Sequence, residues 1–324
     1  MYNLTTYSKI ISRIRQTAVS ISSKIGHPYL IYRAFWHMKI TPPHLYNTDI
    51  QYFAAIPNRG AGIGHQIANW IAGYWFAKNF ELKFAHIPFS TDLWESFLNF
   101  GENEVSVEQL ISDGYSIRRL PLFDENDIEQ LTLIKRIIAS YEGKKIVFVA
   151  EQDQFYRDQY GIMDTIKSKF FSLHDRKETS LLYDYDNYNI AIHIRRGDIM
   201  TDPTNLNLTM RFLANGYYEK VLANVLKRIE TEKPIHIWLF SQGIREDYRE
   251  FEKFPNLHWC LDMNPQDSFL HMVFADLLIT SKSSFSYKPA LISNGIKVCP
   301  KEFWHSYPDT SDWILADNYG NLLN

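Results

Sequence analysis

Cysteines, long apolar runs and net charge are all scarce in this sequence. Its 324 residues include two cysteines, Cys260 and Cys299, each inside an apolar segment, which favours buried free thiols in a reducing compartment and leaves no zinc-site spacing. No stretch reaches the roughly twenty apolar residues of a membrane-spanning helix, and charges interrupt the N-terminal stretch, so we expect no signal peptide. The formal net charge of -3 gives no reason to expect nucleic acid as a partner. Any anion site must therefore be local.

Acidic residues are absent from residues 1–48, although this segment contains six lysines and arginines. Ile10, Ile11 and Ile14 could form an apolar stripe beside the basic face, a pattern typical of a helix that lies on an anionic membrane surface. A basic helix docked on the body of the protein explains the same pattern. Residues 1–48 are therefore expected to form a separate basic amphipathic segment, with an anionic membrane surface as one candidate partner.

The rest of the sequence predicts a globular α/β protein. Hydrophobic residues make up 45% of the chain, and its length fits two domains of ordinary size. Short apolar runs alternate with helical patterns, which indicates parallel sheets covered by helices. Strands are expected at 52–56, 82–87, 145–150, 190–194, 235–240, 257–261, 276–280 and 296–299. Helices are expected at 65–75, 107–111, 128–140, 157–172, 216–231, 246–253, 266–274 and 285–293.

The apolar run at residues 190–194 leads directly into Arg195-Arg196-Gly197-Asp198. Both faces of this run are largely apolar, as expected of a central strand in a parallel sheet. Ligands of open α/β sheets bind beyond such strand ends, and two guanidinium groups placed there suit a phosphate or a pyrophosphate. Gly197 would let the backbone approach that ligand. The alternative is a surface turn whose arginines pair with acids elsewhere.

A glycine-rich turn follows the first expected strand. Gly60, Gly62 and Gly64 precede a helical pattern, and the order strand, glycine loop, helix is found at phosphate-binding sites. Many α/β crossovers use glycine only to turn the chain, so this motif gains weight only from what accompanies it.

Hydroxyl groups gather between the strand at 276–280 and the next helix. Ser281, Ser283, Ser284 and Ser286 surround Phe285 at this point. One serine would be explained as a helix cap, but several at the carboxyl end of a strand favour an anionic ligand, because backbone amides, the helix dipole and the hydroxyls all point the same way.

The segment His193-Ile194-Arg195-Arg196-Gly197-Asp198 resembles the arginine motif of the α1,2-fucosyltransferases and of their α1,6- and protein O-fucosyltransferase relatives. Three further matches follow the family order. Gly62-Ile63-Gly64-His65-Gln66 resembles the N-terminal glycine motif, Phe240-Ser241 the strand-end pair, and residues 267–286 the C-terminal block. The matches span residues 62–286 and form a specific set.

The resemblance implies an α/β, GT-B-like fold in which two Rossmann-like domains face a central cleft. Residues 49–184 would form the acceptor-side domain and residues 185–324 the GDP-fucose-binding domain. The implied activity moves fucose from GDP-fucose to a glycan hydroxyl, with inversion and without a metal or other cofactor, in α1,2 linkage on a bacterial surface polysaccharide or oligosaccharide. The acid-free residues 1–48 add the expectation of a cytoplasmic enzyme that works at the inner face of the membrane on a lipid-linked acceptor.

The resemblance also implies roles for individual residues. Arg195 would bind the β-phosphate and offset the charge on leaving GDP, in place of a divalent cation, while Arg196 braces the site. Asp267 would accept from guanine N1–H and the exocyclic amine, and His193 would hydrogen-bond the nucleoside. The remaining expected substrate-binding residues are Ser283, Ser284, Phe285 and Ser286 around the phosphates, and Gly62, Gly64, Gln66 and Asn69 in the glycine motif and the helix after it.

Inversion requires a base for the acceptor hydroxyl, unless the leaving phosphate takes the proton. Asp198 and Asp202 are the nearest carboxylates, and we favour an ion-pairing role for Asp198. His65 competes with Asp202 as the base. The family usually has asparagine where this chain has His65, and tryptophans where it has Tyr287-Lys288, so the linkage and the acceptor stay open.

Two rival functions need consideration. Asp184-Tyr185-Asp186 is a DxD triplet, the metal-binding signature of other glycosyltransferases, which would make the chain a manganese enzyme that uses a different nucleotide sugar. The triplet precedes the expected strand instead of following one. Arg196-Gly197-Asp198 is an adhesion tripeptide, which would make the chain a binding module. That function needs an exposed flexible loop, whereas here the tripeptide follows a buried strand.

Overall fold

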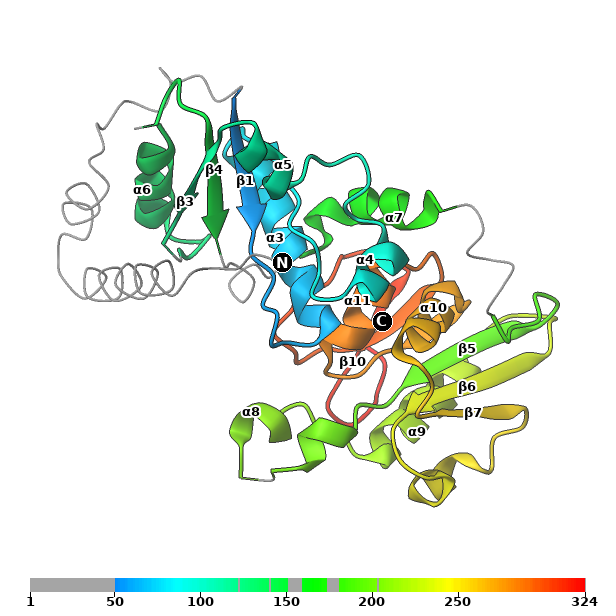
Figure 1. Cartoon of the computed structure of the whole chain (residues 1–324). Helices are drawn as coiled ribbons and strands as arrows, with labels where there is room; N and C mark the ends of the chain where they lie inside the picture. The colour runs from blue at the N-terminus through cyan, green and yellow to red at the C-terminus, as the bar shows by residue number, and fades with distance from the viewer. Residues whose placement is uncertain are drawn as a thin grey trace. The chain divides into compact units, whose positions relative to one another are not determined.

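The computed structural model describes most of the chain beyond the basic N-terminal segment (Figure 1). The described residues are 50–121, 123–139, 141–150, 159–173, 181–202 and 204–323. The amphipathic segment expected at residues 1–48 lies outside them, so its interaction with a membrane stays a prediction.

The chain divides into two compact units that are interleaved along the sequence. The first takes the described residues up to 56, then 72–87 and 104–150, and the second takes 57–71, 88–103 and 159–323. The sequence had indicated a single boundary near residue 185. In the structure the glycine motif at 62–66 is counted with the second unit, which also contains the arginine motif.

The first unit is built on a four-stranded parallel sheet in the order β2-β1-β4-β3. Val147 and Val149 of β4 pack against Ala54, Val107 and Leu110, as the uninterrupted apolar run at the end of this unit predicts. The strands are β1 (Gln51–Ala55), β2 (Lys83–Phe84), β3 (Ser116–Arg119) and β4 (Ile146–Ala150), and the helices are α5 (Val107–Ser112), α6 (Ile128–Ala139) and the later part of α3 (Ile63–Asn79).

The second unit is built on a six-stranded parallel sheet in the order β10-β9-β8-β5-β6-β7. Its strands are β5 (Tyr188–His193), β6 (Ile235–Ser241), β7 (Leu257–Leu261), β8 (Leu277–Ile279), β9 (Ile296–Pro300) and β10 (Trp313–Ala316). Its helices are α4 (Asp92–Leu98), α7 (Met163–Phe171), α8 (Leu206–Thr209), α9 (Asn215–Leu226), α10 (Pro265–Phe274) and α11 (Ser284–Ile292), with the 3-10 helices η2 (Gln159–Ile162), η4 (Gly197–Met200) and η5 (Arg245–Phe251).

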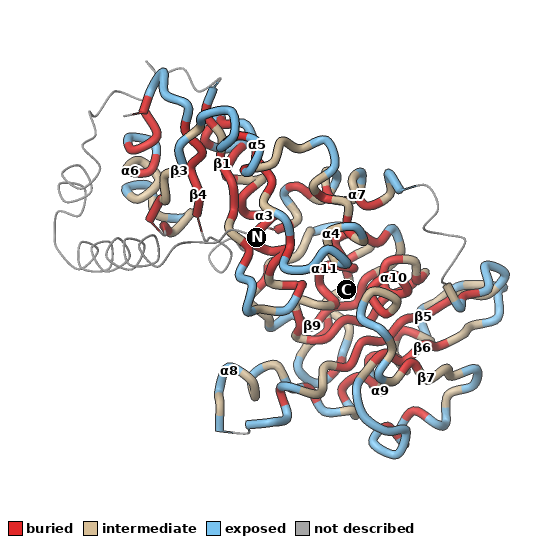
Figure 2. Tube along the Cα trace, in the orientation of Figure 1, coloured by how far each residue is buried: buried red, intermediate tan, exposed pale blue. Residues whose placement is uncertain are grey.

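Strand β5 is a central strand, as its sequence predicts. It pairs with β6 on one side and β8 on the other, and its residues from Asn189 to His193 are buried (Figure 2). Ile190 and Ile192 pack in one cluster with Tyr218 and Val221 of α9. Because the chain proceeds from β5 to β6 and β7 and then returns to β8 on the opposite side, the strand order reverses between β5 and β8. Ligand sites of open α/β sheets lie outside the carboxyl ends of strands at such a point.

Two parallel sheets flanked by helices confirm the predicted α/β fold class and are what a GT-B-like chain requires. The facing arrangement of two domains stays a prediction. Several boundaries differ: the strand expected at 82–87 is reduced to β2, because His86 instead forms an isolated bridge with Ser106, and the helix expected at 246–253 is the 3-10 helix η5. Helix α9 ends at Leu226 instead of residue 231.

Candidate functional site

Arg195 joins the arginine motif to the serine loop at the reversal point between β5 and β8. Its Nη1 donates to Ser283 Oγ at 3.1 Å, and its backbone N–H donates to Ser281 Oγ at 3.2 Å. Ser281 Oγ is also 2.7 Å from the hydroxyl of Tyr218, which reaches it from α9. The two motifs predicted to contact an anion are therefore adjacent in the structure.

Asp198 holds the Arg195 guanidinium in place. Both of its carboxylate oxygens accept from Arg195 Nη2, at 2.8 and 2.7 Å. This geometry agrees with the ion-pairing role that the sequence favoured for Asp198. Gly197 makes the intervening turn, with φ +72, and a Cβ at this position would come within 2.0 Å of Gln242 Oε1. The backbone conformation therefore favours glycine, whereas the space would need only a shift of the flexible Gln242 side chain.

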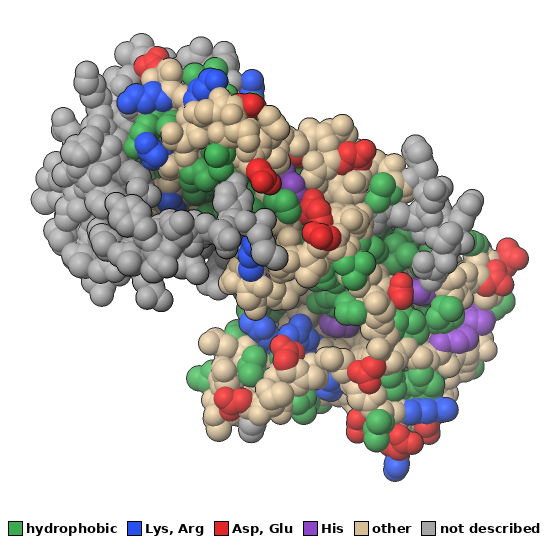
Figure 3. All heavy atoms as spheres, in the orientation of Figure 1, with side chains coloured by type: hydrophobic (Ala, Val, Ile, Leu, Met, Phe, Trp, Pro, Cys, Tyr) green, Lys and Arg blue, Asp and Glu red, His purple; other side chains and the backbone are tan. Residues whose placement is uncertain are grey.

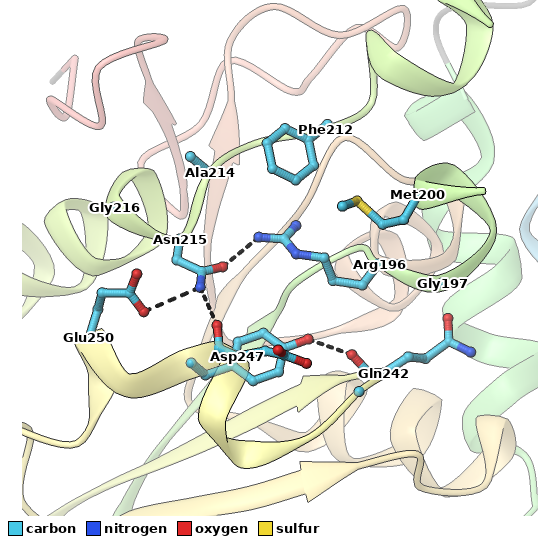
Figure 4. Close-up of a pocket in the computed structure, with 12 residues that line it drawn as sticks. Arg196, Gly197, Met200, Phe212, Ala214, Asn215, Gly216, Gln242, Asp247 and Glu250 are labelled. Atoms are coloured by element: carbon cyan, nitrogen blue, oxygen red, sulfur yellow. Dashed lines mark hydrogen bonds between the residues drawn. The ribbon is translucent and has the colours of Figure 1, made fainter. Parts of the chain in front are cut away.

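The Arg196 side chain points toward Asn215 (Figure 4). Its Nη1 donates to the Arg195 carbonyl at 2.7 Å, its Nη2 donates to Asn215 Oδ1 at 2.5 Å, and its Cζ is 4.7 Å from the centre of the Phe212 ring. Asn215 is held in turn by the carbonyl of Asp247 at 2.6 Å. These contacts fit the bracing role expected for Arg196. Arg196, Phe212, Asn215 and Asp247 line a cavity of about 550 Å³.

A second cavity, of about 500 Å³, lies over the carboxyl ends of β5 and β6. His193 and Phe285 lie in its wall, with ring centres 5.5 Å apart. The buried Nδ1 of His193 has no hydrogen-bond partner among the residues that the structure describes. Burial, followed by the charges of Arg195 and Arg196, lowers the pKa of His193 to about 3. The ring is therefore neutral, and Nδ1 is available to a ligand. The other lining residues are Ile194, Arg195, Arg196, Asp198, Phe240, Ser241, Gln242, Asp262, Met263, Pro265 and Ser268.

Asp267 lies in the first turn of α10, next to this cavity wall but not among its lining residues. Its carbonyl is 2.7 Å from Nδ1 of His271. Ser268 of the same turn and Asp262 of the preceding loop do line the cavity, although neither was among the site residues predicted from the sequence. Asp262 directly follows β7, as the arginine motif follows β5, and this strand-end position could have identified it from the sequence.

The serine loop divides into structural and accessible hydroxyls. Ser283 caps α11 by accepting from Phe285 N at 3.2 Å, and it also accepts from Arg195. Ser286 is fully buried and its Oγ accepts from Ser281 N at 3.1 Å. Ser284 is half-buried, and its Oγ is 3.2 Å from Nε2 of His305. Of the four serines, Ser284 combines partial exposure with a place in the first turn of α11.

The glycine motif contacts the serine loop within the second unit. A Cβ on Gly64 would lie 2.6 Å from the backbone carbon of Ser284, whereas a Cβ on Gly62 would meet nothing within 4 Å. Gln66 is buried and bonds to Ser90, accepting from its N–H at 2.9 Å and donating to its Oγ at 2.8 Å. Asn69 Oδ1 accepts from the backbone of Asn58 at 3.0 Å. Gln66 and Asn69 thus shape the loops at the start of α3.

The two candidate bases differ in their surroundings. Asp202 is exposed, and its Oδ1 accepts from Thr204 Oγ1 at 2.6 Å and from Thr204 N at 3.0 Å, which lowers the pKa of its carboxyl. A carboxylate so stabilised is a weaker base. His65 is half-buried in the first turn of α3. Burial, followed by the charges of Lys288 and His65, holds the pKa of His305 well below its usual value.

The two rival sites are placed differently from the cavity over β5 and β6. Asp184 and Asp186 lie before β5, at the end opposite to the arginines, and Asp184 Oδ1 accepts from the backbone of Asp186 at 3.0 Å. In the part of the chain that the structure describes, no group of three or more histidines, cysteines, aspartates and glutamates is placed to hold a metal ion. The tripeptide ending at Asp198 is tied down by Arg195 and is not a free loop.

Charge and hydropathy of the described surface add two observations. Acidic and basic side chains are interspersed on the face drawn in Figure 3. Among the helices within the described ranges, none is both long and apolar enough to cross a bilayer.

No protein-family model matches the chain, and no curated protein matches it either. Solved structures of fucosyltransferases are similar to it at low identity. The NodZ α1,6-fucosyltransferase co-crystallised with GDP has 11% identity and a TM-score of 0.44, with 86% of this chain and 98% of that chain covered. Fucosyltransferase NodZ from Bradyrhizobium has 10% identity and a TM-score of 0.43, with 76% and 94% covered. The apo form of POFUT1 has 11% identity and a TM-score of 0.46, with 78% and 96% covered.

Proposed function

We propose that this protein is a metal-independent, inverting fucosyltransferase that moves fucose from GDP-fucose to a glycan hydroxyl. The single observation that carries the proposal is the placement of Arg195, which Ser283 and Asp198 hold at the reversal point of the sheet. The remote structural similarities are too weak to contribute.

The phosphate end of the donor binds at Arg195. The buried Nε of Arg195 has no hydrogen-bond partner among the described residues, so one of its donors awaits an acceptor. The start of α11 adds backbone N–H groups and the positive end of the helix dipole. A guanidinium fixed at this point offsets the negative charge that develops on the leaving diphosphate. In other transferases a divalent cation stabilises that charge.

The nucleoside end of the donor binds in the cavity over β5 and β6. Its volume of about 500 Å³ is within the range of small-molecule pockets. Neutral His193 offers Nδ1 as a donor or an acceptor, according to its tautomer. Guanine differs from uracil in presenting an N1–H and an amino group side by side, which suit a carboxylate. Asp267 is our proposed partner, and Asp262 in the cavity wall is an alternative carboxylate.

The acceptor proton has two candidate routes. Asp198 is bound to Arg195 through both of its oxygens, so its proposed role is to position the guanidinium. His65 becomes the preferred base, because the carboxylate of Asp202 is already stabilised by Thr204. The leaving phosphate is the second route. The proposed product is an α1,2-linked fucose on a bacterial surface polysaccharide or oligosaccharide, built in the cytoplasm on a lipid-linked acceptor at the inner face of the membrane.

Product analysis tests this proposal. The purified protein is incubated with GDP-fucose, EDTA and galactose-terminated oligosaccharides, and the product is examined by NMR. We expect an α-fucoside, because GDP-fucose carries a β-linked sugar and the reaction inverts it. Formation of a β-fucoside, or activity only with manganese and a UDP-sugar, would show that the proposed function is wrong.

A further inference from the structure

A third arginine, Arg211, belongs to none of the motifs that predicted the site. Arg211 follows α8, and its Cζ is 4.8 Å from the centre of the Trp304 ring. This distance is typical of a guanidinium resting on an indole face. The two residues are 93 positions apart by their numbers and belong to the same compact unit.

The platform under Arg211 is connected to the serine loop. Trp304 Nε1 donates to His305 Nε2 at 3.1 Å. His305 Nε2 is also 3.2 Å from Ser284 Oγ. The His305 ring is stacked on Tyr287 of α11 with ring centres 4.4 Å apart. Arg211 is therefore held by an ordered aromatic group that is attached to the first turns of α11.

The guanidinium of Arg211 has unused hydrogen-bonding capacity. Its Nε is buried and has no hydrogen-bond partner within the described residues. A buried donor without an acceptor is costly, and in native structures it usually marks a missing ligand, ion or water. The aromatic face of Trp304 stabilises the charge but accepts no in-plane hydrogen bond from Nε.

The serine loop connects Arg211 to the neighbourhood of Arg195: His305, which Trp304 contacts, is 3.2 Å from Ser284 Oγ, and the adjacent Ser283 accepts from Arg195. Burial lowers the pKa of Arg211, the charge of Arg195 lowers it further, and the charge of Asp198 raises it. Asp198 already gives both carboxylate oxygens to Arg195. Arg195, Arg211 and Asp198 together carry a surplus positive charge that an anion would neutralise.

We propose that Arg211 is a second guanidinium ligand of the anion that Arg195 binds, contacting a different oxygen of the same diphosphate. The inference rests on the proposed function for the identity of the nucleotide, but not for the existence of the anion site. Two guanidinium groups approaching one diphosphate from different elements would raise both its affinity and the stability of the leaving group.

Calorimetric titration with inorganic pyrophosphate, GDP and guanosine tests the inference. Arg211→Ala should weaken pyrophosphate and GDP binding about tenfold, the value of one charge-assisted hydrogen bond, and leave guanosine binding unchanged. Trp304→Leu should also weaken the binding of pyrophosphate and GDP, because it removes the indole on which Arg211 rests. Arg245→Ala is the matched control: Arg245 also rests on an indole, with its Cζ 5.2 Å from the Trp259 ring, but it pairs with Glu252. It should bind all three compounds as wild type does.

The outcomes separate this inference from the proposed function. Wild-type affinity of a folded Arg211→Ala protein for pyrophosphate would overturn the inference, whatever GDP does. If the wild type binds pyrophosphate but not GDP, and Arg211→Ala binds pyrophosphate more weakly, the inference stands and the guanine nucleotide is wrong. If the wild type binds neither, both are wrong. Melting temperatures of the variants establish that each is folded.

Discussion

Arg195 and Ser283 are joined by a hydrogen bond of 3.1 Å between Nη1 and Oγ, although 88 positions separate them in the sequence. The bond links the end of β5 to the cap of α11, at the point where the order of the parallel strands reverses. Because Ser283 also accepts from Phe285 N, the guanidinium is fixed relative to the first turn of the helix. An anion placed there meets a charge and a helix N-terminus together.

Replacing Arg195 should abolish turnover while leaving the fold intact. Arg195→Ala should lose at least about two to three orders of magnitude in kcat, the usual value of one donor to a developing negative charge. Arg195→Lys should be scarcely better, because a single ammonium cannot replace the two nitrogens that bond Ser283 and Asp198. Steady-state kinetics with GDP-fucose measures this loss. A Lys variant that retains a tenth or more of wild-type kcat would show that guanidinium geometry is unimportant.

The glycine motif offers a matched pair of substitutions. Gly64→Ala should destabilise the protein by about 1–3 kcal/mol and weaken GDP binding, because the added Cβ meets the backbone of Ser284 at 2.6 Å. Gly62→Ala should be nearly neutral, because nothing lies within 4 Å of its Cβ. Urea unfolding and GDP titration compare the two variants. Equal effects would mean that the packing of Gly64 on α11 has no role in the site.

Acid should destabilise the protein through His193. Its pKa is about 3 in the folded state against a usual value of 6.5, so the unfolded chain binds more protons between these pH values. Stability attributable to neutral His193 is complete above pH 6.5 and falls by about 1.4 kcal/mol per pH unit below it. Urea midpoints at pH 7.5 and 5.0 measure the loss. His193→Asn should lose less over this interval than wild type, and an equal loss in both would contradict the assignment.

The basic N-terminal segment predicts reversible binding to anionic vesicles. Its six positive charges are each worth about 1 kcal/mol near such a surface at low salt. The full chain should sediment with anionic liposomes, less so as salt is raised, and a chain lacking residues 1–44 should not. Equal sedimentation of the two chains would leave the proposed lipid-linked acceptor without its main support.

Periodicity and strand-end chemistry were enough to predict much of the site. The carboxyl ends of parallel strands meet at one sheet edge, so the approach of Arg195 to Ser283 followed from recognising β5 and β8. Arg211, Trp304 and His305 could not be found in this way. They lie in loops without hydrophobic periodicity, and only the tertiary fold brings them together.

Some elements and one motif placement also escaped the sequence. Helix α4 is too short to show a clear helical periodicity in the sequence. It begins at Thr91, whose Oγ1 accepts from Trp94 N at 3.3 Å. Strand β10 pairs with β9 through long-range register, with Trp313 opposite Lys297. The contact of Gly64 with Ser284 brings two backbones close together, which is possible because glycine has no side chain. The glycine alone does not indicate which segment approaches it.

The most direct test of a guanosine diphosphate site at Arg195 is a comparison of melting temperatures. The wild type and Arg195→Ala are each measured with GDP or UDP, with and without EDTA. We predict that GDP raises the melting temperature of the wild type to the same extent with and without EDTA, that UDP does not, and that Arg195→Ala loses most of the GDP effect. A shift with UDP that requires manganese, or an undiminished GDP shift in Arg195→Ala, would contradict the account.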